Sequence, residues 1–390
     1  MVVPVAGEWE RWMSTPGIVK QCRPPRPMRA ISPSQSALLR ACPLRVSWAA
    51  SGQPPLLPEH PAAMIGRAAH RLLEEAGSGK LCGLGKEAIE SRWEELVQEI
   101  ERRMQSSWLH RGLIPLREAV AYYEVRRLQV VARAAELAAS RAVVPGSIGA
   151  PAHGYGYELA VRSRDGLMTG VIDAVVPSVE GPVIRDYKTG ALPEPVGGGR
   201  QARYDHTLQI KLYAVLYAET FGCWPARLQL VPLAGEPMDV SFDENECTLL
   251  ASEAKEELQS VNASIASCTS PAAAVAALAR PSPETCRSCT YRPGCTRYWK
   301  VAGDPPGIEW PADVRGRLRE VKHLLNGQAL LEVQTSRGVA RVRGIDPDLS
   351  RHAALKLLRP QQNVAVFNLR REGTGLQFAE TCMTVIYADP

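Results

Sequence analysis

Apolar residues recur at intervals of three and four along the first 150 residues, which is the spacing of one face of an α-helix. The pattern is clearest in PAAMIGRAAHRLLEEAG, residues 61–77, where His70 lies among the apolar positions. Longer stretches of the same spacing, rich in Glu, Arg and Ala, predict helices over about 86–108 and 115–143. The N-terminal part of the chain is therefore expected to be mainly helical.

A Pro- and Arg-rich segment without periodicity, residues 1–30, precedes these helices, and we expect it to be loosely ordered. A short helix should follow it. Ser32 or Ser34 is a suitable N-cap, and the helix should end near Cys42 because Pro43 comes next. Cys42 is thus predicted to lie at the end of a short helix.

From Tyr155 onward the period of the pattern shortens, and apolar residues gather in β-prone segments separated by turn residues. Three consecutive strands are predicted, over residues 155–163, 167–177 and 181–190. A Gly- and Pro-rich loop over 191–200 then leads to a helix over 204–222, a strand near 226–233 and a helix over about 243–266. Helices that flank a mixed sheet indicate an α/β core.

The end of the chain has a different pattern. After a predicted linker at 301–311, β-prone segments lie near 328–335, 338–344, 362–370 and 375–388, with one short helix at about 350–358. This order suits a small closed barrel of the OB type, and it fits several other small β folds equally well. We therefore expect a small β-rich C-terminal domain, with the OB barrel as one candidate.

Composition agrees with this division. A chain of 390 residues with 45% hydrophobic residues can bury one substantial core and a smaller second one. We assign the lead-in to 1–30, the α/β domain to 31–300 and the β-rich domain to 311–390. No apolar run approaches the roughly 18 residues needed to span a membrane, and the start lacks the apolar segment of a secretory signal. A cytoplasmic protein without membrane contact is expected.

Charge permits nucleic-acid binding without demonstrating it. The net charge is only +5, although Arg outnumbers Lys and suits bidentate contact with phosphate. Basic residues of the C-terminal domain could form a platform for single-stranded DNA, or they could be solvated on a domain that packs against the core. They are Arg337, Arg341, Arg343, Arg351, Lys356, Arg359, Arg370 and Arg371.

Three charged residues are predicted to lie on neighbouring strands. Asp173 interrupts the apolar run GVIDAVV, and Asp186 and Lys188 stand two apart in IRDYKTG. Because residues two apart on a strand share a face, Asp186 and Lys188 should point the same way. A surface ion pair would account for those two alone. It would leave Asp173 unexplained, because a carboxylate in an apolar strand is costly unless a cation or hydrogen bonds receive it.

Two carboxylates on adjacent strands offer the hard oxygen ligands that Mg²⁺ or Mn²⁺ prefers. A lysine beside them, Lys188, can orient or deprotonate the attacking water. Glu158 on the preceding strand is a candidate third carboxylate, although a single Glu on a strand is also common on a solvated surface. The pattern indicates a site for phosphodiester hydrolysis.

One group among the ten cysteines has ligand spacing. In a protein expected to be cytosolic, so many cysteines argue against a disulfide framework. Cys286, Cys289 and Cys295 in CRSCTYRPGC can supply three thiolates, and a metal site there needs a fourth ligand. A zinc site requires a Cys or His nearby, and none follows closely. The remaining cysteines lack ligand spacing and are expected to be small hydrophobes or surface thiols.

Three segments together, GVIDAVV, VIRDYKTG and QIKLYAVLYA, resemble the RecB-type branch of the PD-(D/E)XK nuclease superfamily. That branch includes the AddB helicase–nuclease subunits and the CRISPR adaptation exonucleases. The resemblance covers about residues 31–300, and it implies a restriction-endonuclease-like α/β core with metal-dependent nuclease activity. Ile172 stands where the superfamily name has Pro, and Asp186 where many members have Glu. Both departures are common in this branch.

The resemblance also implies roles for further residues. Gly66 and His70 match a helical GxxxH motif whose histidine is an extra metal ligand, beside the aspartates Asp173 and Asp186. Glu158 matches the strand glutamate of the family. Without the family, a histidine inside a helix would be read as a packing residue.

Gln209 and Tyr213 lie four apart on a predicted helix and so project from one face. They match the Q…Y motif that the family uses beside the scissile phosphate, and Lys188 matches its lysine. Tyr213 taken alone would suit ordinary core packing.

The upstream Cys42 matches the isolated cysteine that iron–sulfur nucleases of this branch carry before the core, with Cys286, Cys289 and Cys295 after it. The resemblance therefore implies a 4Fe-4S cluster in preference to zinc. Such a cluster would close a loop across the whole catalytic core and pin its two ends together. A structural role is expected ahead of redox sensing.

The chain is thus expected to be a DNA nuclease, and an exonuclease in particular, in DNA repair, recombination or anti-phage defence. It has no GxxxxGK[ST] phosphate loop, so it would act alone on DNA ends or join a helicase or defence-system partner. Two alternatives are a non-catalytic DNA-binding or partner-docking module with the same fold, and an iron–sulfur electron carrier or sensor. The first leaves the filled catalytic positions unused, and the second leaves the carboxylates and lysine unexplained.

Overall fold

The computed structural model describes residues 22–142, 154–190, 193–196, 199–356, 358–373 and 375–389. The helices up to the cysteine cluster are α2 (Pro33–Ala41), α3 (Pro43–Ala50), α4 (Pro61–Gly77), α5 (Lys86–Gln105), η1 (Arg111–Leu113), α6 (Leu116–Ala119), α7 (Tyr123–Ala142), α8 (Tyr204–Phe221), α9 (Glu244–Ser267), α10 (Pro271–Leu278) and α11 (Pro283–Arg287). The first seven strands are β1 (Gly156–Arg162), β2 (Thr169–Ser178), β3 (Gly181–Lys188), β4 (Pro193–Val196), β5 (Gly199–Ala202), β6 (Arg227–Pro232) and β7 (Met238–Asp239).

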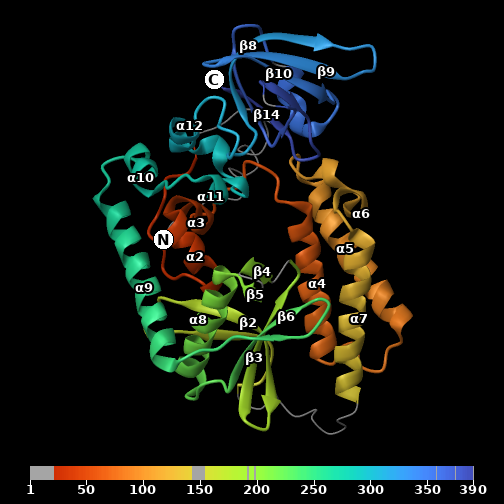
Figure 1. The fold of residues 1–390 in the computed structure, drawn as a ribbon, viewed down its shortest axis with the longest axis vertical. Coiled ribbons are helices and arrows are strands. Elements are labelled where there is room, and N and C mark those ends of the chain that lie inside the picture. Colours follow the sequence, from red (N-terminus) through yellow and green to blue (C-terminus); the bar gives the residue numbers. More distant parts are fainter. Residues whose placement is uncertain are drawn as a thin grey trace, which may run out of the picture.

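A mixed five-stranded sheet in the order β1-β2-β3-β6-β7 forms the centre of the α/β core (Figure 1). Strands β1, β2 and β3 form an antiparallel meander. Strand β6 runs parallel to β3, and α8 makes the crossover between them. Parallel neighbours require such a crossover, so the helix that follows β3 is brought back across the sheet beside the end of that strand. The predicted α/β fold class is confirmed.

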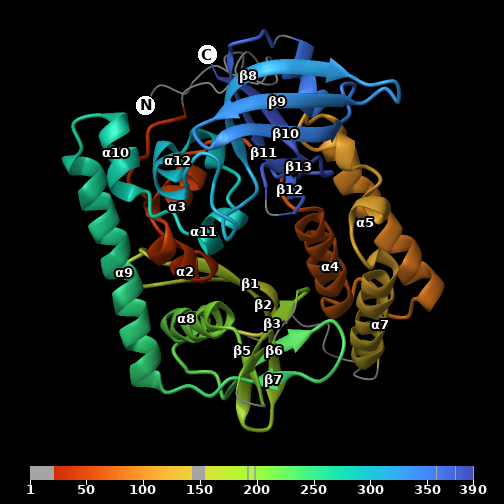
Figure 2. The same ribbon diagram turned by 45° about the horizontal axis from the view of Figure 1, so that its top comes forward.

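Helices cover both faces of this sheet (Figure 2). On one face, Val175 and Ile184 pack in a core with residues of α2, α3, α8 and α9. On the other, Ala174 and Tyr187 pack against α4, α5 and α7. The alternation follows from the pleat, because successive strand residues point to opposite faces. Residues 61–142, which carry α4 to α7, are called the helical arm below.

The C-terminal domain, residues 311–390, contains a second sheet of seven strands in the order β12-β13-β10-β9-β8-β11-β14. The elements of this part of the chain are η2 (Arg292–Gly294), α12 (Thr296–Ala302), β8 (Val314–His323), β9 (Ala329–Thr335), β10 (Gly338–Ile345), η3 (Ser350–Lys356), β11 (Asn363–Phe367), β12 (Arg370–Arg371), β13 (Gln377–Ala379) and β14 (Val385–Asp389). The expected β-rich domain is present. β8 pairs with both β9 and β11, β11 pairs with β14, and β10 runs parallel to β13. With η3 between β10 and β11, this arrangement is compatible with the OB barrel that was one candidate.

Several elements differ from the predictions. The expected helix over 115–143 is broken between α6 and α7, where Tyr122 has a φ of 56°. Pro43 begins a second helix, α3, at its first position, where a proline's missing N–H costs nothing. The loop predicted at 191–200 contains the β4–β5 hairpin. The strand β8 was not expected, because only its Val314 and Leu318 are buried among charged residues.

The basic residues of the C-terminal domain are largely engaged within it. Arg341 Nε lies 3.1 Å from Glu332, and Arg343 pairs with Glu372. Arg351 is only 3% exposed. These contacts favour a packing role over an open basic platform. Among the described residues, no helix has both the length and the apolar character needed to cross a membrane.

A substitution of Gly316 on β8 tests the packing of this second sheet. A Cβ there would lie 2.1 Å from the backbone oxygen of Gln334 on β9, and a backbone atom cannot move aside cheaply. We expect Gly316→Ala to lower the free energy of unfolding by about 2 kcal/mol, the usual cost of overpacking. Gly375→Ala is the matched control, because its Cβ would meet nothing within 4 Å. Equal urea midpoints for the two variants would contradict this register.

Candidate active site

A cavity of ≈ 350 Å³ opens where β3 ends. Its walls include His70 from α4, Asp173 from β2, Asp186 and Lys188 from β3, and Gln209 from α8. These residues are separated by up to 139 positions in the sequence, and the sheet with its two helical layers brings them together. The five were all predicted as site residues.

The two aspartates stand opposite each other on neighbouring strands of the sheet. The pairing of β2 with β3 matches Ala174 with Arg185, so Asp173 stands opposite Asp186. Asp173 Oδ2 accepts a hydrogen bond of 2.7 Å from the backbone N–H of Tyr187. Asp186 is 3% exposed, and burial, followed by the charge of Asp173, raises its pKa to about 6. The pair is a concentration of negative charge that a cation would relieve.

Lys188 and Gln209 close a ring with Asp186. Lys188 Nζ lies 2.6 Å from Asp186 Oδ2 and donates to Gln209 Oε1 at 2.9 Å. Gln209 Nε2 in turn donates to Asp186 Oδ1 at 3.2 Å. Asp186 Oδ2 is buried and receives no hydrogen bond of good geometry, so its contact with Lys188 is an ion pair only. The lysine is held at the carboxylates by the glutamine.

His70 reaches the same carboxylates from the helical arm. Its Nδ1 lies 3.5 Å from Asp173 Oδ2. Burial alone would lower the pKa of His70, but its hydrogen bond and charge interaction with Asp173 raise it overall. One turn earlier, a Cβ on Gly66 would lie 3.0 Å from Thr189 Oγ1. The glycine of the GxxxH motif thus lets α4 approach the end of β3.

Glu158 and Tyr213, also predicted, do not line the cavity. Glu158 is exposed and has a φ of 50°, a strained conformation for a non-glycine residue. The β1–β2 register places it opposite Asp173. Tyr213 is 6% exposed and packs so closely on Gly170 that a Cβ there would lie 2.8 Å from its ring. Tyr213 therefore packs next to the site without lining the cavity.

Five residues of the cavity wall were not foreseen: Tyr187, Thr189, Gly190, Arg203 and His206. Burial, followed by the charge of Lys188, lowers the pKa of His206 to about 4, so its ring is neutral at physiological pH. His206 lies three residues before Gln209 on the same helix, and that spacing could have identified it. Arg203 precedes the helix, where no periodic signal exists.

The cavity offers two carboxylates and one imidazole as donors for a divalent metal ion. Within the described ranges, no three His, Cys, Asp or Glu side chains stand close enough to hold a metal as they are arranged. The chemistry nevertheless fits, because Asp173 and Asp186 are opposed carboxylates and one buried oxygen of Asp186 lacks a hydrogen bond. The Lys188 ammonium stands beside that oxygen, where it supplies positive charge.

A family model for the PD-(D/E)XK nuclease superfamily matches residues 30–296, which is more than half of the chain. The chain belongs to this superfamily. PD-(D/E)XK proteins are generally nucleases that act on DNA and typically use divalent metals such as Mg²⁺. No curated protein and no solved structure is significantly similar to the chain. The PD-(D/E)XK match ends directly after Cys295, so the C-terminal domain lies outside it.

A second pocket within the PD-(D/E)XK region is lined by all four predicted cysteines, Cys42, Cys286, Cys289 and Cys295. None of the ten cysteines, all of which lie in the described part of the chain, forms a disulfide. Burial raises the pKa of Cys286 to about 11 and that of Cys295 to about 12. These thiols would stay protonated unless a metal replaced their protons, as metals do on binding cysteine. The pocket therefore has the donor chemistry of a thiolate metal site.

Cys22 lies next to this pocket, although its position in the sequence gave no sign of it. A Cβ on Gly294 would come within 2.1 Å of the Cys22 Sγ. Gly294 immediately precedes Cys295, so Cys22 packs directly on the segment that carries this ligand candidate. The glycine is required for that approach.

The buried Asp186 carboxyl group makes a testable contribution to stability. Because the pKa of Asp186 is raised in the folded protein to about 6 from 3.8, its ionisation opposes folding. The stability it contributes is present below about pH 4 and is lost as the pH rises through about 6. In EDTA, the free energy of unfolding of Asp186→Asn relative to the wild type should therefore rise by about 2 kcal/mol between about pH 4.5 and 7.5.

Urea unfolding at both pH values measures this difference. The exposed Asp348→Asn is the control, and its difference from the wild type should stay constant. An Asp186→Asn difference that does not change with pH would contradict the burial of an ionisable carboxyl at this position.

Proposed function

We propose that the protein is a metal-dependent deoxyribonuclease of the RecB-type branch, and that it is an exonuclease. The observation that carries the proposal is the convergence of His70, Asp173, Asp186, Lys188 and Gln209 on one cavity. An electron carrier would have no use for this set. A non-catalytic DNA-binding module would have no reason to hold a lysine against a buried carboxylate at its energetic cost.

In this proposal, Asp173, Asp186 and His70 hold Mg²⁺ or Mn²⁺. The metal, when bound, would polarise the phosphoryl group and make water more acidic. Lys188, fixed by Gln209, orients the attacking water or takes its proton. Glu158, opposite Asp173, remains the candidate to hold a further water.

Gln209 and Tyr213 are proposed to act beside the scissile phosphate. Gln209 stands in the cavity wall and reaches both Asp186 and Lys188. Tyr213 sits one turn along α8 from Gln209, where burial raises the pKa of its hydroxyl and the Gln209 side chain lowers it. Tyr213 would therefore act on the phosphate indirectly, by holding Gln209 in position.

The biological setting is proposed from the family resemblance. The resemblance to AddB-type subunits and CRISPR adaptation exonucleases supports a role on DNA ends, in repair, recombination or anti-phage defence. A cytoplasmic helicase or defence-system protein would supply such ends, because the chain carries no phosphate loop of its own.

We further propose that Cys42, Cys286, Cys289 and Cys295 hold a 4Fe-4S cluster. Their presence around one pocket supports this, since Cys42 joins α2 to α3 at the start of the core and the others follow its end. The cluster would act as a staple across the nuclease domain, because it ties positions more than 240 residues apart.

The nuclease proposal predicts that Lys188→Met lowers the cleavage rate by about two to four orders of magnitude, the usual contribution of a positioned proton-transfer group. DNA binding should be retained, because one neutralised side chain removes few phosphate contacts. The assay uses end-labelled linear DNA with Mg²⁺, and EDTA should abolish cleavage by the wild type.

Lys255→Met is the control for loss of a lysine, since Lys255 pairs with Asp165 at 2.8 Å away from the cavity. Covalently closed single-stranded circles test the exonuclease part, because an enzyme that needs ends leaves them intact. Cleavage by Lys188→Met at the wild-type rate would rule out the assigned site. Cleavage of circles would rule out only the exonuclease part.

The cluster proposal predicts that the purified protein is brown and contains about four iron and four sulfide per chain. Cys42→Ser should lose the iron and the sulfide as completely as Cys286→Ser, because each variant removes one of the four proposed ligands. Cys82→Ser, an exposed cysteine outside the pocket, should keep the metal. A colourless wild type with stoichiometric zinc would overturn the cluster.

A further inference from the structure

Arg292 is the feature that neither the catalytic site nor the cysteine ligands explain. It lies in η2, between Cys289 and Cys295, and is only 2% exposed. Its Nη1 donates to the backbone oxygens of Cys286 at 2.7 Å and Cys289 at 3.1 Å. A third bond goes to the oxygen of Arg287 at 3.3 Å. The guanidinium thus fixes the backbone of the cysteine loop, residues 286–295.

The other edge of the guanidinium binds the C-terminal domain. Arg292 Nε donates to Asp313 Oδ2 at 2.9 Å, and Nη2 donates to Asn368 Oδ1 at 2.5 Å. Asp313 is fully buried and also accepts from the Tyr298 hydroxyl at 2.7 Å and the Asn368 N–H at 2.8 Å. A buried ion pair with this many hydrogen bonds has its desolvation offset only while both partners are in place.

An apolar cluster continues the same interface. It contains Cys286 together with residues of α12 and of the C-terminal strands, and it reaches the helical arm. Its buried members are Leu57, Leu109, Cys286, Tyr298, Trp299, Ala302, Ala365, Phe367, Val385 and Tyr387. The Tyr387 hydroxyl also donates to the backbone oxygen of Leu56 at 2.5 Å. The C-terminal domain therefore forms one side of the cysteine site.

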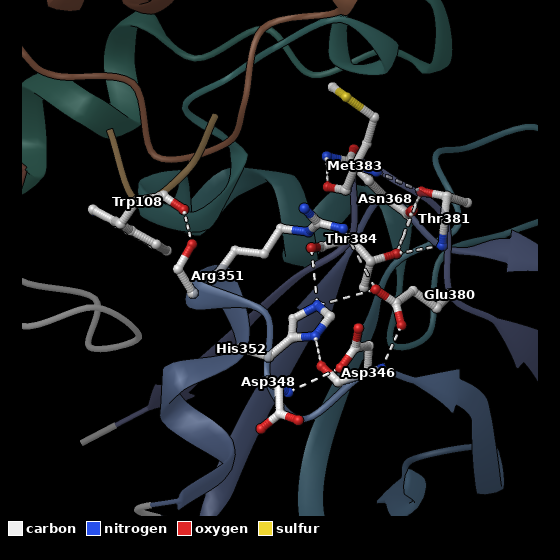
Figure 3. Close-up of polar contacts among 11 residues, drawn as sticks. Trp108, Asp346, Asp348, Arg351, His352, Asn368, Glu380, Thr381, Met383 and Thr384 are labelled. Atoms are coloured by element: carbon white, nitrogen blue, oxygen red, sulfur yellow. Dashed lines mark hydrogen bonds and ion pairs between the residues drawn. The ribbon is translucent and has the colours of Figure 1, made fainter. Parts of the chain in front are cut away.

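The far side of the C-terminal domain contacts the helical arm through η3 (Figure 3). The Ser350 hydroxyl donates to the Trp108 oxygen at 2.9 Å, and the Trp108 ring meets Tyr387 edge-on at 6.1 Å. Arg351 lies so near Gly112 that a Cβ there would be 2.4 Å from its Nη1. The buried ring of His352 lies between the backbone oxygens of Asp346 and Thr384 and holds η3 to the domain.

We propose that the C-terminal domain is a rigid connection between the cysteine loop and the helical arm, called the crossbar below. Arg292 is its positioning residue. One end of the crossbar is the Arg292–Asp313 pair. The other end is the contact between η3 and residues 108–112 of the helical arm. The arm also carries His70 on α4, so the crossbar joins the cysteine loop to the helical layer from which that side chain reaches the cavity. The coupling goes beyond the proposed nuclease function and rests on the cluster proposal only for the identity of the group bound by the cysteines.

Amide hydrogen exchange on the full-length protein tests the coupling. Arg292→Met should raise exchange in the cysteine loop and in residues 108–113 of the arm by about tenfold or more, as local opening of a docked segment does. Arg297→Met, an exposed arginine on α12, is the matched control and should leave both segments unchanged. Arg292→Lys keeps the charge but cannot serve three carbonyls and Asp313 together, so it should restore part of the protection.

Arg292→Met also leaves Asp313 buried without its cation, which can prevent folding. The double variant Arg292→Met/Asp313→Leu removes both charges and is therefore measured beside it. It should keep the C-terminal domain folded while the loop carbonyls still lack their donor. Faster exchange in both segments supports the crossbar. Faster exchange in the loop alone, with residues 108–113 at the wild-type rate, overturns it.

A spectroscopic readout separates this proposal from the cluster proposal. If the wild type contains the iron–sulfur cluster, a chelator should bleach its absorption about tenfold faster in Arg292→Met than in Arg297→Met, because the loop that carries the thiolates opens more often. If the wild type holds zinc or no metal, the cluster proposal fails and the exchange comparison still decides the crossbar. Equal bleaching and equal exchange in the two variants overturn it.

Discussion

Two carboxylates on adjacent strands, Asp173 and Asp186, impose the constraint around which the rest of the molecule is arranged. Each would be costly to bury, and together they repel each other. The surrounding structure offsets this cost in part, through the N–H of Tyr187, the amide of Gln209 and the ammonium of Lys188. The remaining imbalance is the raised pKa of Asp186, and it is the property that makes the site suited to a cation.

This constraint explains why both layers of helices are needed. The crossover from β3 to β6 must contain a helix, and that helix presents Gln209 to the carboxylates. The helical arm covers the opposite face and presents His70. Gly66 permits α4 to approach the end of β3 closely. Neither layer alone would surround the charge.

Much of this could be predicted from the sequence, because the signals are local. The three- and four-residue spacing located α4 with His70, and the two-residue spacing placed Asp186 and Lys188 on one face. The pairs that depend on distant residues were not predictable. Nothing near Arg292 indicates that Asp313 and Asn368 will receive it, and the break at Tyr122 has no proline or glycine to mark it. Strand β8 was missed for a different reason, because only Val314 and Leu318 of its ten residues are buried and charged residues fill most of the other positions.

Tyr387 follows Cys295 by 92 residues, yet it packs in the same cluster as Cys286 and bonds to Leu56. A ribosome releases the chain from its N-terminus, so every cysteine candidate leaves the exit tunnel well before this tyrosine is made. Until then Cys286 lacks the C-terminal residues that pack against it. The interval between synthesis of Cys295 and synthesis of Tyr387 is therefore the period in which Cys286 stays open on that side, and the folding of β14 closes it.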